Sequence, residues 1–220
     1  ELINSRVRST AVLYQALSTI THSIKTVVSA SAIGFYGADT GEQECVETSP
    51  AGLDFLADCT KQWEEAVDQI ATLGIRLAKV RIGLVMGTAG GIFPVISKPI
   101  RYYVGANLGS GKQWQSWIHI NDLVRIFNEL LINSSLSGVY NGVAPEPIRA
   151  GEMNKQIAKA LHRPFFLPSI PGFLLRLVLG EMACLVLGGS RVSSAKIEKD
   201  AAFSFTFVRF EEALKELVHV

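Results

Sequence analysis

The alternation of apolar and polar positions predicts strands separated by helices along the first two thirds of the chain. Residues 26–31 are a short run of β-branched and small side chains, and a turn follows at 33–37. A helix is expected over 54–73 and a second strand over 75–84. A helix between two strands is typical of a parallel sheet. The pattern therefore predicts an α/β fold whose chemistry lies at the end of strand 26–31, because open parallel sheets bind ligands at the carboxyl ends of their strands.

The remaining elements follow from the same periodicities. Residues 1–17 show the three- to four-residue apolar spacing of an amphipathic helix. In the helix at 54–73, the expected apolar face consists of Phe55, Cys59, Trp63, Ala66 and Ile70. Later in the chain we expect a strand at 113–120, a helix at 123–132 capped by Asn121 and Asp122, a strand at 139–143, and helices at 150–161 and 210–218.

A change in residue pattern suggests two parts. Beyond residue 147 the strand pattern gives way to helical segments and proline-containing connections, and residues 88–111 are interrupted by Gly and Pro. We expect a sheet domain made of 1–87 and 112–146, and a smaller, mainly helical subdomain made of 88–111 and 147–220.

Composition narrows the class of protein. Hydrophobic residues make up 48% of the 220 residues and charged residues 19%, which favours a large core. A net charge of +1 gives no global attraction to nucleic acid or to anionic lipid. The three cysteines are scattered and lack metal-ligand spacing, so we expect a cytoplasmic setting without structural zinc.

One stretch resembles a membrane segment. Residues 171–189 are strongly apolar, but Arg176 and Glu181 interrupt them, which favours two helices packed into a core or an interface. Residues 1–17 lack the apolar region of a signal peptide. That first helix also has no preceding strand or cap, so we expect the chain to begin inside a domain.

Four motifs are informative through the order in which they follow one another: VSASAIGFYG at 28–37, RIGLVMG at 81–87, WIHIND at 117–122 and YNGV at 140–143. Together they resemble strand ends of the extended short-chain dehydrogenases, the family of nucleotide-sugar epimerases. Further matches at 55–57, 63–65, 109–112 and 187–192 point to its atypical, epimerase-like branch. The resemblance implies the C-terminal part of a Rossmann-type, doubly wound parallel sheet, with the smaller subdomain binding substrate.

The resemblance also implies NADP or NAD as cofactor and a nucleotide sugar or related polar molecule as substrate. The family's Gly-rich cofactor turn is absent here, so we expect the first βαβ units to be missing and this chain alone to bind no cofactor measurably. The nicotinamide side would be formed by Ser29, Ala30, Ser31, Arg81, Gly83, Leu84 and Val85. Substrate contacts would come from Lys112, Trp117, His119 and Arg191. The sequence leaves open whether the protein forms a homodimer.

The catalytic pair of the family is the main departure. Its Tyr and Lys lie four residues apart on one helix face, but no YxxxK occurs here, and Leu56 and Thr60 stand at the matching positions. Ser31 matches the family's serine. One hypothesis is that Tyr36 or a water performs the remaining proton transfer; the alternative is that Tyr36 packs against its turn and the chain is a non-catalytic dinucleotide-binding or protein-interaction module.

Each remaining candidate has a structural alternative. His119 could be hydrogen-bonded within the sheet, Trp117 could belong to the core, and Lys112 could lie on a surface turn. Arg191 suits a nucleotide diphosphate, but a salt bridge explains it equally. A hydrolase built from Ser31, His119 and Asp122 is disfavoured because Ser31 lacks the G-x-S-x-G turn that exposes a nucleophile.

Overall fold

Three parallel strands form the central sheet of the computed structural model, which describes residues 2–218. The strands are β1 (Thr26–Ala32), β3 (Arg76–Ile82) and β7 (Gly138–Gly142), hydrogen-bonded in the order β1-β3-β7. Ser31 lies beside Arg81, and Arg81 lies beside Asn141. The carboxyl ends of all three strands therefore meet at one edge, as the sequence predicts.

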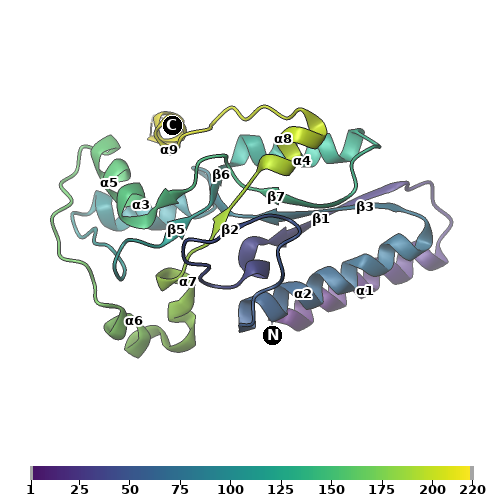
Figure 1. The fold of residues 1–220 in the computed structure, drawn as a ribbon, viewed down its shortest axis with the longest axis horizontal. Helices are drawn as coiled ribbons and strands as arrows, with labels where there is room; N and C mark the ends of the chain where they lie inside the picture. The colour runs from purple at the N-terminus through teal and green to yellow at the C-terminus, as the bar shows by residue number, and fades with distance from the viewer. Residues whose placement is uncertain (1, 219–220) are drawn as a thin grey trace.

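Helices cover both faces of this sheet (Figure 1). One layer contains α1 (Leu2–Thr19) and α2 (Phe55–Asp68), which continues as the 3-10 helix η2 (Gln69–Leu73). The opposite layer contains α4 (Ile120–Ile132) and α8 (Ala195–Ala201). The chain passes from β1 through α2 to β3 and from β3 through α4 to β7, so the α/β, doubly wound arrangement is confirmed.

The strand expected at 75–84 divides at Gly83. β3 ends at Ile82, and β4 (Leu84–Met86) pairs instead with β6 (Trp117–His119). The Gly83 amide donates to the Gly142 carbonyl, whereas the next amide, of Leu84, donates to the Ser116 carbonyl. The chain thus changes its hydrogen-bonding partner within one residue.

The strand expected at 113–120 divides as well. Its first part, β5 (Trp114–Gln115), pairs antiparallel with β8 (Ile148–Arg149), and β6 follows after Ser116. The 3-10 helix η1 (Ile33–Tyr36) follows β1, and β2 (Glu44–Cys45) pairs in parallel with β9 (Arg191–Val192).

Two predictions about helices need correction. On the predicted face, Ile70 is buried but Phe55 is 64% exposed, and the buried residues of α2 are instead Ala57, Thr60, Glu64 and Val67. The apolar pattern misleads here because the buried face carries a charged residue that has found partners. At α4 the cap is His119, whose side chain accepts from the Asn121 amide, and neither Asn121 nor Asp122 caps the helix.

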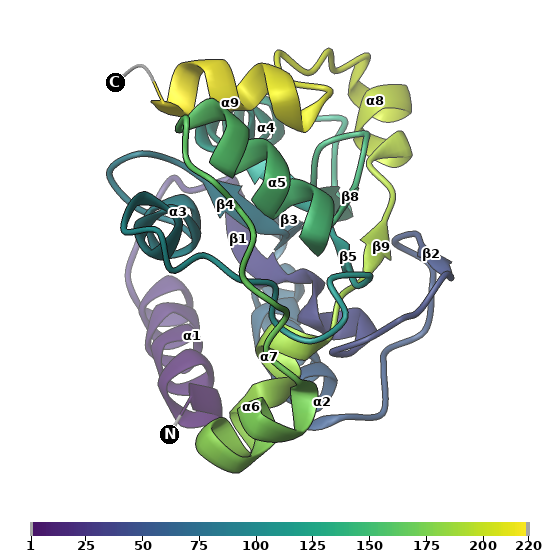
Figure 2. The ribbon, with the colours of Figure 1, turned by 90° about the vertical axis from the view of Figure 1, so that its left-hand side faces the viewer.

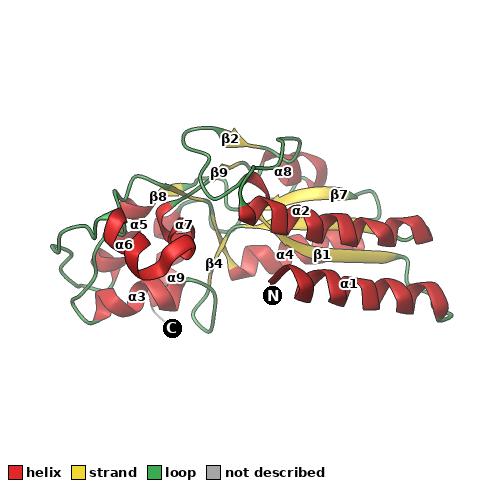
Figure 3. Cartoon of the chain, turned by 90° about the horizontal axis from the view of Figure 1, so that it is seen from below, coloured by secondary structure: helices red, strands yellow, loops and turns green. Residues whose placement is uncertain are grey.

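A second group of helices packs at the other end of the molecule (Figures 2 and 3). α3 (Phe93–Arg101), which the sequence did not predict, packs with α5 (Ala150–Ala160) and α9 (Phe210–Val218) in one apolar cluster. Pro94 is accommodated because the first turn of a helix needs no amide donor there.

The apolar segment at 171–189 forms α6 (Gly172–Leu179), the 3-10 helix η3 (Gly180–Ala183) and the short α7 (Cys184–Leu187). Of the two expected placements, burial in a core does not hold for α6, because Phe173, Leu177 and Val178 are mostly exposed, and packing at an interface stays a prediction. Within residues 2–218, no helix combines the length and the apolar character needed to cross a bilayer. The residue bounds of the sheet domain and the helical subdomain stay a prediction. Ile197 of α8, which falls within the predicted subdomain, packs against the central sheet.

Gly83 offers a direct test of the strand switch. A Cβ atom at this position would collide with the Ser116 carbonyl oxygen and lie 2.8 Å from Val143 Cγ1. Gly83→Ala should therefore lower the free energy of unfolding by about 1–3 kcal/mol, measured by urea denaturation. Gly90→Ala is the matched control, since a Cβ there meets nothing within 4 Å. Equal effects of the two substitutions would contradict a packing constraint at Gly83.

Candidate active site

A buried carboxylate accepts a hydrogen bond from the serine hydroxyl at the carboxyl end of β1. Ser31 is 4% exposed, and its Oγ donates to Glu64 Oε1 at 2.6 Å. Glu64 lies on α2 and is 5% exposed. The serine that matches the family's substrate-positioning group is thus engaged with the helix beneath the strand.

Arg81 forms the second side of this cluster. Its Nε and Nη2 donate to Glu64 Oε1 and Oε2, both at 2.9 Å, in a two-point pairing. The guanidinium also lies over the Phe35 ring, 3.4 Å from its centroid. Arg81 and Ser31 are register partners in the sheet, so their side chains emerge on the same face and reach the same carboxylate.

Tyr36 extends the cluster to the third strand. Its hydroxyl donates to Asn141 Oδ1 at 2.7 Å and accepts from Arg81 Nη1 at 3.1 Å. The Asn141 amide in turn donates to Glu47 Oε1 at 2.9 Å. We call Ser31, Tyr36, Glu64, Arg81 and Asn141 the buried polar network.

The network sets the protonation of its members. Burial raises the pKa of Tyr36 to about 12, and the charge and hydrogen bond of Arg81 only partly oppose it. Burial also works against ionisation of Glu64, yet the hydrogen bonds from Arg81 and Ser31 and the charges of Arg81 and Lys79 prevail and lower its pKa. At neutral pH the phenol is therefore protonated and the carboxylate is charged.

The helix positions that would carry the family's Tyr and Lys are covered. Thr60 is 7% exposed, and its hydroxyl donates to the Leu56 carbonyl at 2.9 Å. A Cβ atom at Gly34 of η1 would lie 3.5 Å from Thr60 Oγ1 and 3.7 Å from Leu56 Cβ. η1 therefore packs directly over the place where a phenol–ammonium pair would act.

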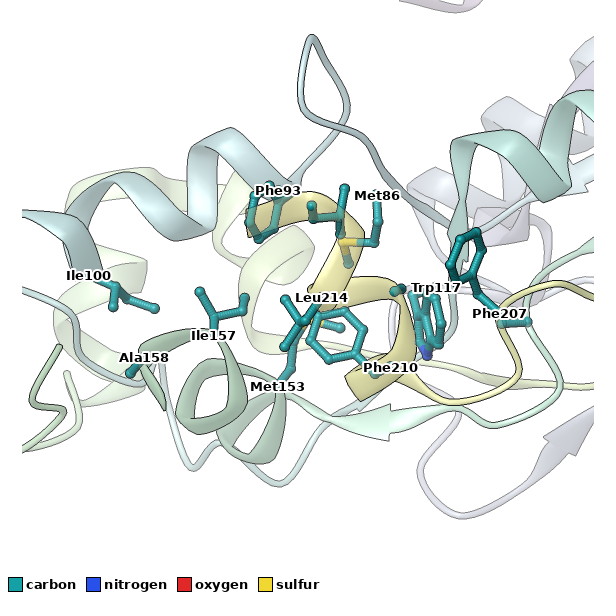
Figure 4. Close-up of a cluster of buried hydrophobic side chains, with 13 residues drawn as sticks. Met86, Phe93, Ile100, Trp117, Met153, Ile157, Ala158, Phe207, Phe210 and Leu214 are labelled. Carbon is teal, nitrogen blue, oxygen red and sulfur yellow. The ribbon is translucent and has the colours of Figure 1, made fainter. Parts of the chain in front are cut away.

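Two predicted substrate residues lie in the interior. Trp117 is fully buried, packs edge-on against Phe210 at 5.1 Å, and donates from Nε1 to the Glu146 carbonyl (Figure 4). His119 is 2% exposed and stacks on Phe207 at 4.2 Å. Burial lowers the pKa of His119 despite the opposing charges of Glu216 and Asp122. Neither geometry supports contact with a substrate, because both side chains are enclosed by packing.

Asp122 belongs to a separate anchor. Its carboxylate accepts from the Thr206 and Phe207 amides and from Arg125, which ties α4 to the segment before α9. The structure therefore does not bring Asp122 and Ser31 into one catalytic arrangement.

The two predicted cationic contacts are on the surface. Lys112 is exposed just after the turn at 109–110. Arg191 pairs with Glu44 at 3.3 Å, and its Nε is buried without a hydrogen-bond partner among the described residues. Nearby, Arg149 lies over the Trp114 ring at 3.7 Å and makes a two-point pair with Glu42.

The predicted nicotinamide wall lies at the edge of the sheet. Ser29 and Ala30 are half-buried on β1, and no other described strand pairs with the outer edge of β1. Leu84 and Val85 follow on β4. Leu84 also borders a cavity of about 300 Å³ between α3 and α5, which the sequence did not predict.

Sequence reasoning missed Glu64 and Asn141 as members of the network. Both stood inside quoted motifs, at 63–65 and 140–143, but nothing local showed their burial. An unpaired polar residue on an otherwise amphipathic helix face is the only signal that could have indicated Glu64. Among the described residues, no group of three or more His, Cys, Asp or Glu could hold a metal ion.

Glu64 is the centre of the network, so its charge can be tested. Glu64→Gln leaves Arg81 buried without its counter-charge and should lower the free energy of unfolding at neutral pH by on the order of 3 kcal/mol. Glu65→Gln is the matched control, since the Glu65 side chain is 62% exposed and its ion pair with Lys61 is long, at 3.9 Å.

The pH dependence of stability provides a second test of the Glu64 charge. Because the folded-state pKa of Glu64 is lowered, its contribution is complete above the ordinary glutamate pKa of about 4.3 and is lost as the pH falls through the folded-state value. The stability gap between wild type and Glu64→Gln, followed by urea denaturation, should therefore close in acid. A constant gap, or one no larger than that of Glu65→Gln, would contradict the network.

The chain was compared with known proteins. A model described as a domain of unknown function, DUF1731, matches residues 170–217. The chain is 38% identical over 221 residues to the chloroplastic homologue of epimerase family protein SDR39U1 from Arabidopsis thaliana, covering 99% of this chain and 62% of that protein. It is 36% identical over 219 residues to epimerase family protein SAR0825 of Staphylococcus aureus, covering 99% of this chain and 72% of that protein.

A solved structure agrees with these relatives. The human epimerase family protein SDR39U1 (isoform 2), crystallised with NADPH, superimposes with a TM-score of 0.89 at 30% identity, covering 99% of this chain and 73% of that one. The chain thus spans between three fifths and three quarters of the length of these proteins. With identity above 30% across nearly all of its residues, the chain belongs to the epimerase family of short-chain dehydrogenase-like proteins.

Proposed function

We propose that this chain supplies the nicotinamide-side wall and the substrate-binding part of an NAD(P)-dependent epimerase or oxidoreductase. The observation that carries the proposal is the buried polar network, which fixes the carboxyl ends of β1, β3 and β7 at one edge of the sheet. That edge is where doubly wound folds bind dinucleotides. The human relative with NADPH supports the same cofactor class.

The described residues fit one half of such a cofactor. Ser29 and Ala30 are small and half-buried on β1, so they leave room for a planar ring near the carboxyl end of the strand. The G-x-G-x-x-G turn, which would bind the pyrophosphate at a helix N-terminus, does not occur in this sequence. When bound, NAD(P) supplies reversible hydride transfer. The wall and Leu84 would position the ring and the substrate beside it.

Within this proposal, Ser31 and Tyr36 are positioning residues. Both hydroxyls donate hydrogen bonds to buried acceptors on Glu64 and Asn141, and the raised pKa of Tyr36 disfavours proton release near neutral pH. Arg81 bonds to Glu64 and Tyr36 at once, so the guanidinium ties the two side chains into one arrangement.

A second candidate is a non-catalytic dinucleotide-binding module. It is favoured by the packing of η1 over Leu56 and Thr60, which leaves the family's proton-transfer position covered. A cytoplasmic location, a small-molecule partner and assembly as a homodimer remain part of the proposal. No nucleic-acid partner is proposed, because the net charge is only +1.

Thermal unfolding with cofactor tests the proposal. We expect NADPH or NADH to raise the Tm of the complete natural polypeptide that carries residues 1–220, because a ligand that binds only the folded state stabilises it by about 2.7 kcal/mol at a hundred times its Kd. Tyr36→Phe should keep this shift, since the phenol faces Asn141 and not the strand edge. Absence of a shift with either cofactor would contradict the proposal.

Absorbance near the reduced-nicotinamide band separates the two candidates. Oxidation of the cofactor with a carbonyl substrate supports the enzyme, and stabilisation without oxidation across a substrate panel supports the binding module. If Tyr36→Phe abolished oxidation while leaving the thermal shift intact, the positioning role of Tyr36 would be wrong.

A further inference from the structure

The cavity beside Leu84 has an apolar lining. It measures about 300 Å³, at the lower end of the ~300–1,000 Å³ typical of small-molecule sites. Its walls come from β4, α3, α5 and the segment at 104–108, with Ile96, Ile100 and Met153 among the side chains. No charged residue is among the described residues that line it. A ligand here would leave water for hydrocarbon contacts.

Two arginines near the cavity already have carboxylate partners. Arg149, on β8 next to the cavity, makes its two-point pair with Glu42, and Arg191 pairs with Glu44. Lys112 is exposed and does not line the cavity. A diphosphate placed here would lose its hydration without meeting a cation among the lining residues, which is strongly unfavourable. The cavity is therefore unsuited to the nucleotide-sugar substrate that the family resemblance implies.

Three carboxamides provide the polar atoms of the lining. Gln113 Nε2 donates to the carbonyls of Leu108 and Val186 at 3.0 and 3.1 Å, so both of its protons hold the wall together. Asn154 Nδ2 donates to Asn107 Oδ1 at 3.0 Å. The side-chain oxygens of Gln113 and Asn154 accept no hydrogen bond from the described residues, but Gln115 is the one of the three whose side chain makes none at all there, so its carboxamide is the freest to meet a ligand.

The wall formed by residues 107–108 and Ile170 is also fixed by backbone hydrogen bonds. Leu108 forms a parallel bridge with Ile170, and the Ile170 amide donates to the Asn107 carbonyl at 2.8 Å. The cavity is thus held open by the fold, so binding needs little reorganisation.

We propose that this cavity binds an uncharged, largely hydrocarbon small molecule that makes one hydrogen bond to Gln115. The inference rests on the proposed function, since Leu84 places the cavity against the nicotinamide-side wall and the ligand would then be the substrate. The substrate class is accordingly a lipophilic alcohol or carbonyl compound.

The test uses 1-naphthol as probe, titrated by fluorescence against the complete polypeptide without NADPH, with UDP and UDP-glucose as competitors. We expect saturable one-to-one binding that neither nucleotide displaces. Displacement by UDP or UDP-glucose, or the absence of saturable 1-naphthol binding, would overturn the proposal. Because no cofactor is present, failure here is distinguishable from failure of the NADPH thermal shift.

Matched variants locate the probe. Val95 lines the cavity on α3 and is 64% exposed, while Val12 on α1 is 67% exposed and does not line it. Val95→Asp places a charge at the rim and should weaken 1-naphthol binding about tenfold or more, whereas Val12→Asp should leave it unchanged. Ala106→Phe, which fills the cavity, should have the same effect as Val95→Asp. Equal binding by all three variants would contradict the assigned site.

Gln115→Leu tests the hydrogen bond. This substitution should weaken 1-naphthol binding roughly threefold to tenfold while leaving the binding of naphthalene unchanged or tighter. An equal loss for both probes would contradict a hydrogen-bonding role for Gln115 and indicate a change in cavity shape instead.

Discussion

The buried pair of Arg81 and Glu64 is the constraint on which this end of the molecule depends. Both side chains are almost completely buried, and desolvation of two charges is offset only by their two-point geometry and by the added bonds from Ser31 and to Tyr36. Removing one partner would leave the other charge uncompensated. The pair therefore joins β1, β3 and α2 into a unit that cannot adjust one element at a time.

This rigidity has a functional consequence. The hydroxyls of Ser31 and Tyr36 point into the network, so the edge where we propose a cofactor presents backbone and small side chains instead of free acid or base groups. One residue beyond the strand switch at Gly83, Leu84 borders an uncharged cavity. A closed polar wall and an apolar cavity therefore meet at β4, and this juxtaposition is the basis for proposing a lipophilic substrate instead of a nucleotide sugar.

Much of the fold could be predicted from sequence, and the failures have physical causes. The order of β1, α2, β3, α4 and β7 follows from periodicity and turn residues, because a parallel sheet needs a helical crossover between strands. The strand breaks at Gly83 and Ser116 could not be predicted, since they depend on long-range hydrogen-bonding partners.

The candidate site was harder to predict. Ser31, Tyr36 and Arg81 were singled out and do lie together, but Glu64 and Asn141, which bind them, look locally like surface residues. Trp117 and His119 carry motif positions yet are enclosed in packing that only the folded chain creates. The cavity is assembled from segments far apart in sequence, so no local pattern encodes it.

The ionisation of Tyr36 tests most directly whether the strand-end hydroxyls are locked in a closed network. The ring carbon that bears the hydroxyl can be followed by NMR in protein labelled with ¹³C-tyrosine, with Tyr36→Phe assigning the signal. The account predicts that the phenol stays protonated through neutral and mildly alkaline pH and titrates with a pKa of about 12. A pKa at or below the ordinary tyrosine value of about 10 would contradict it.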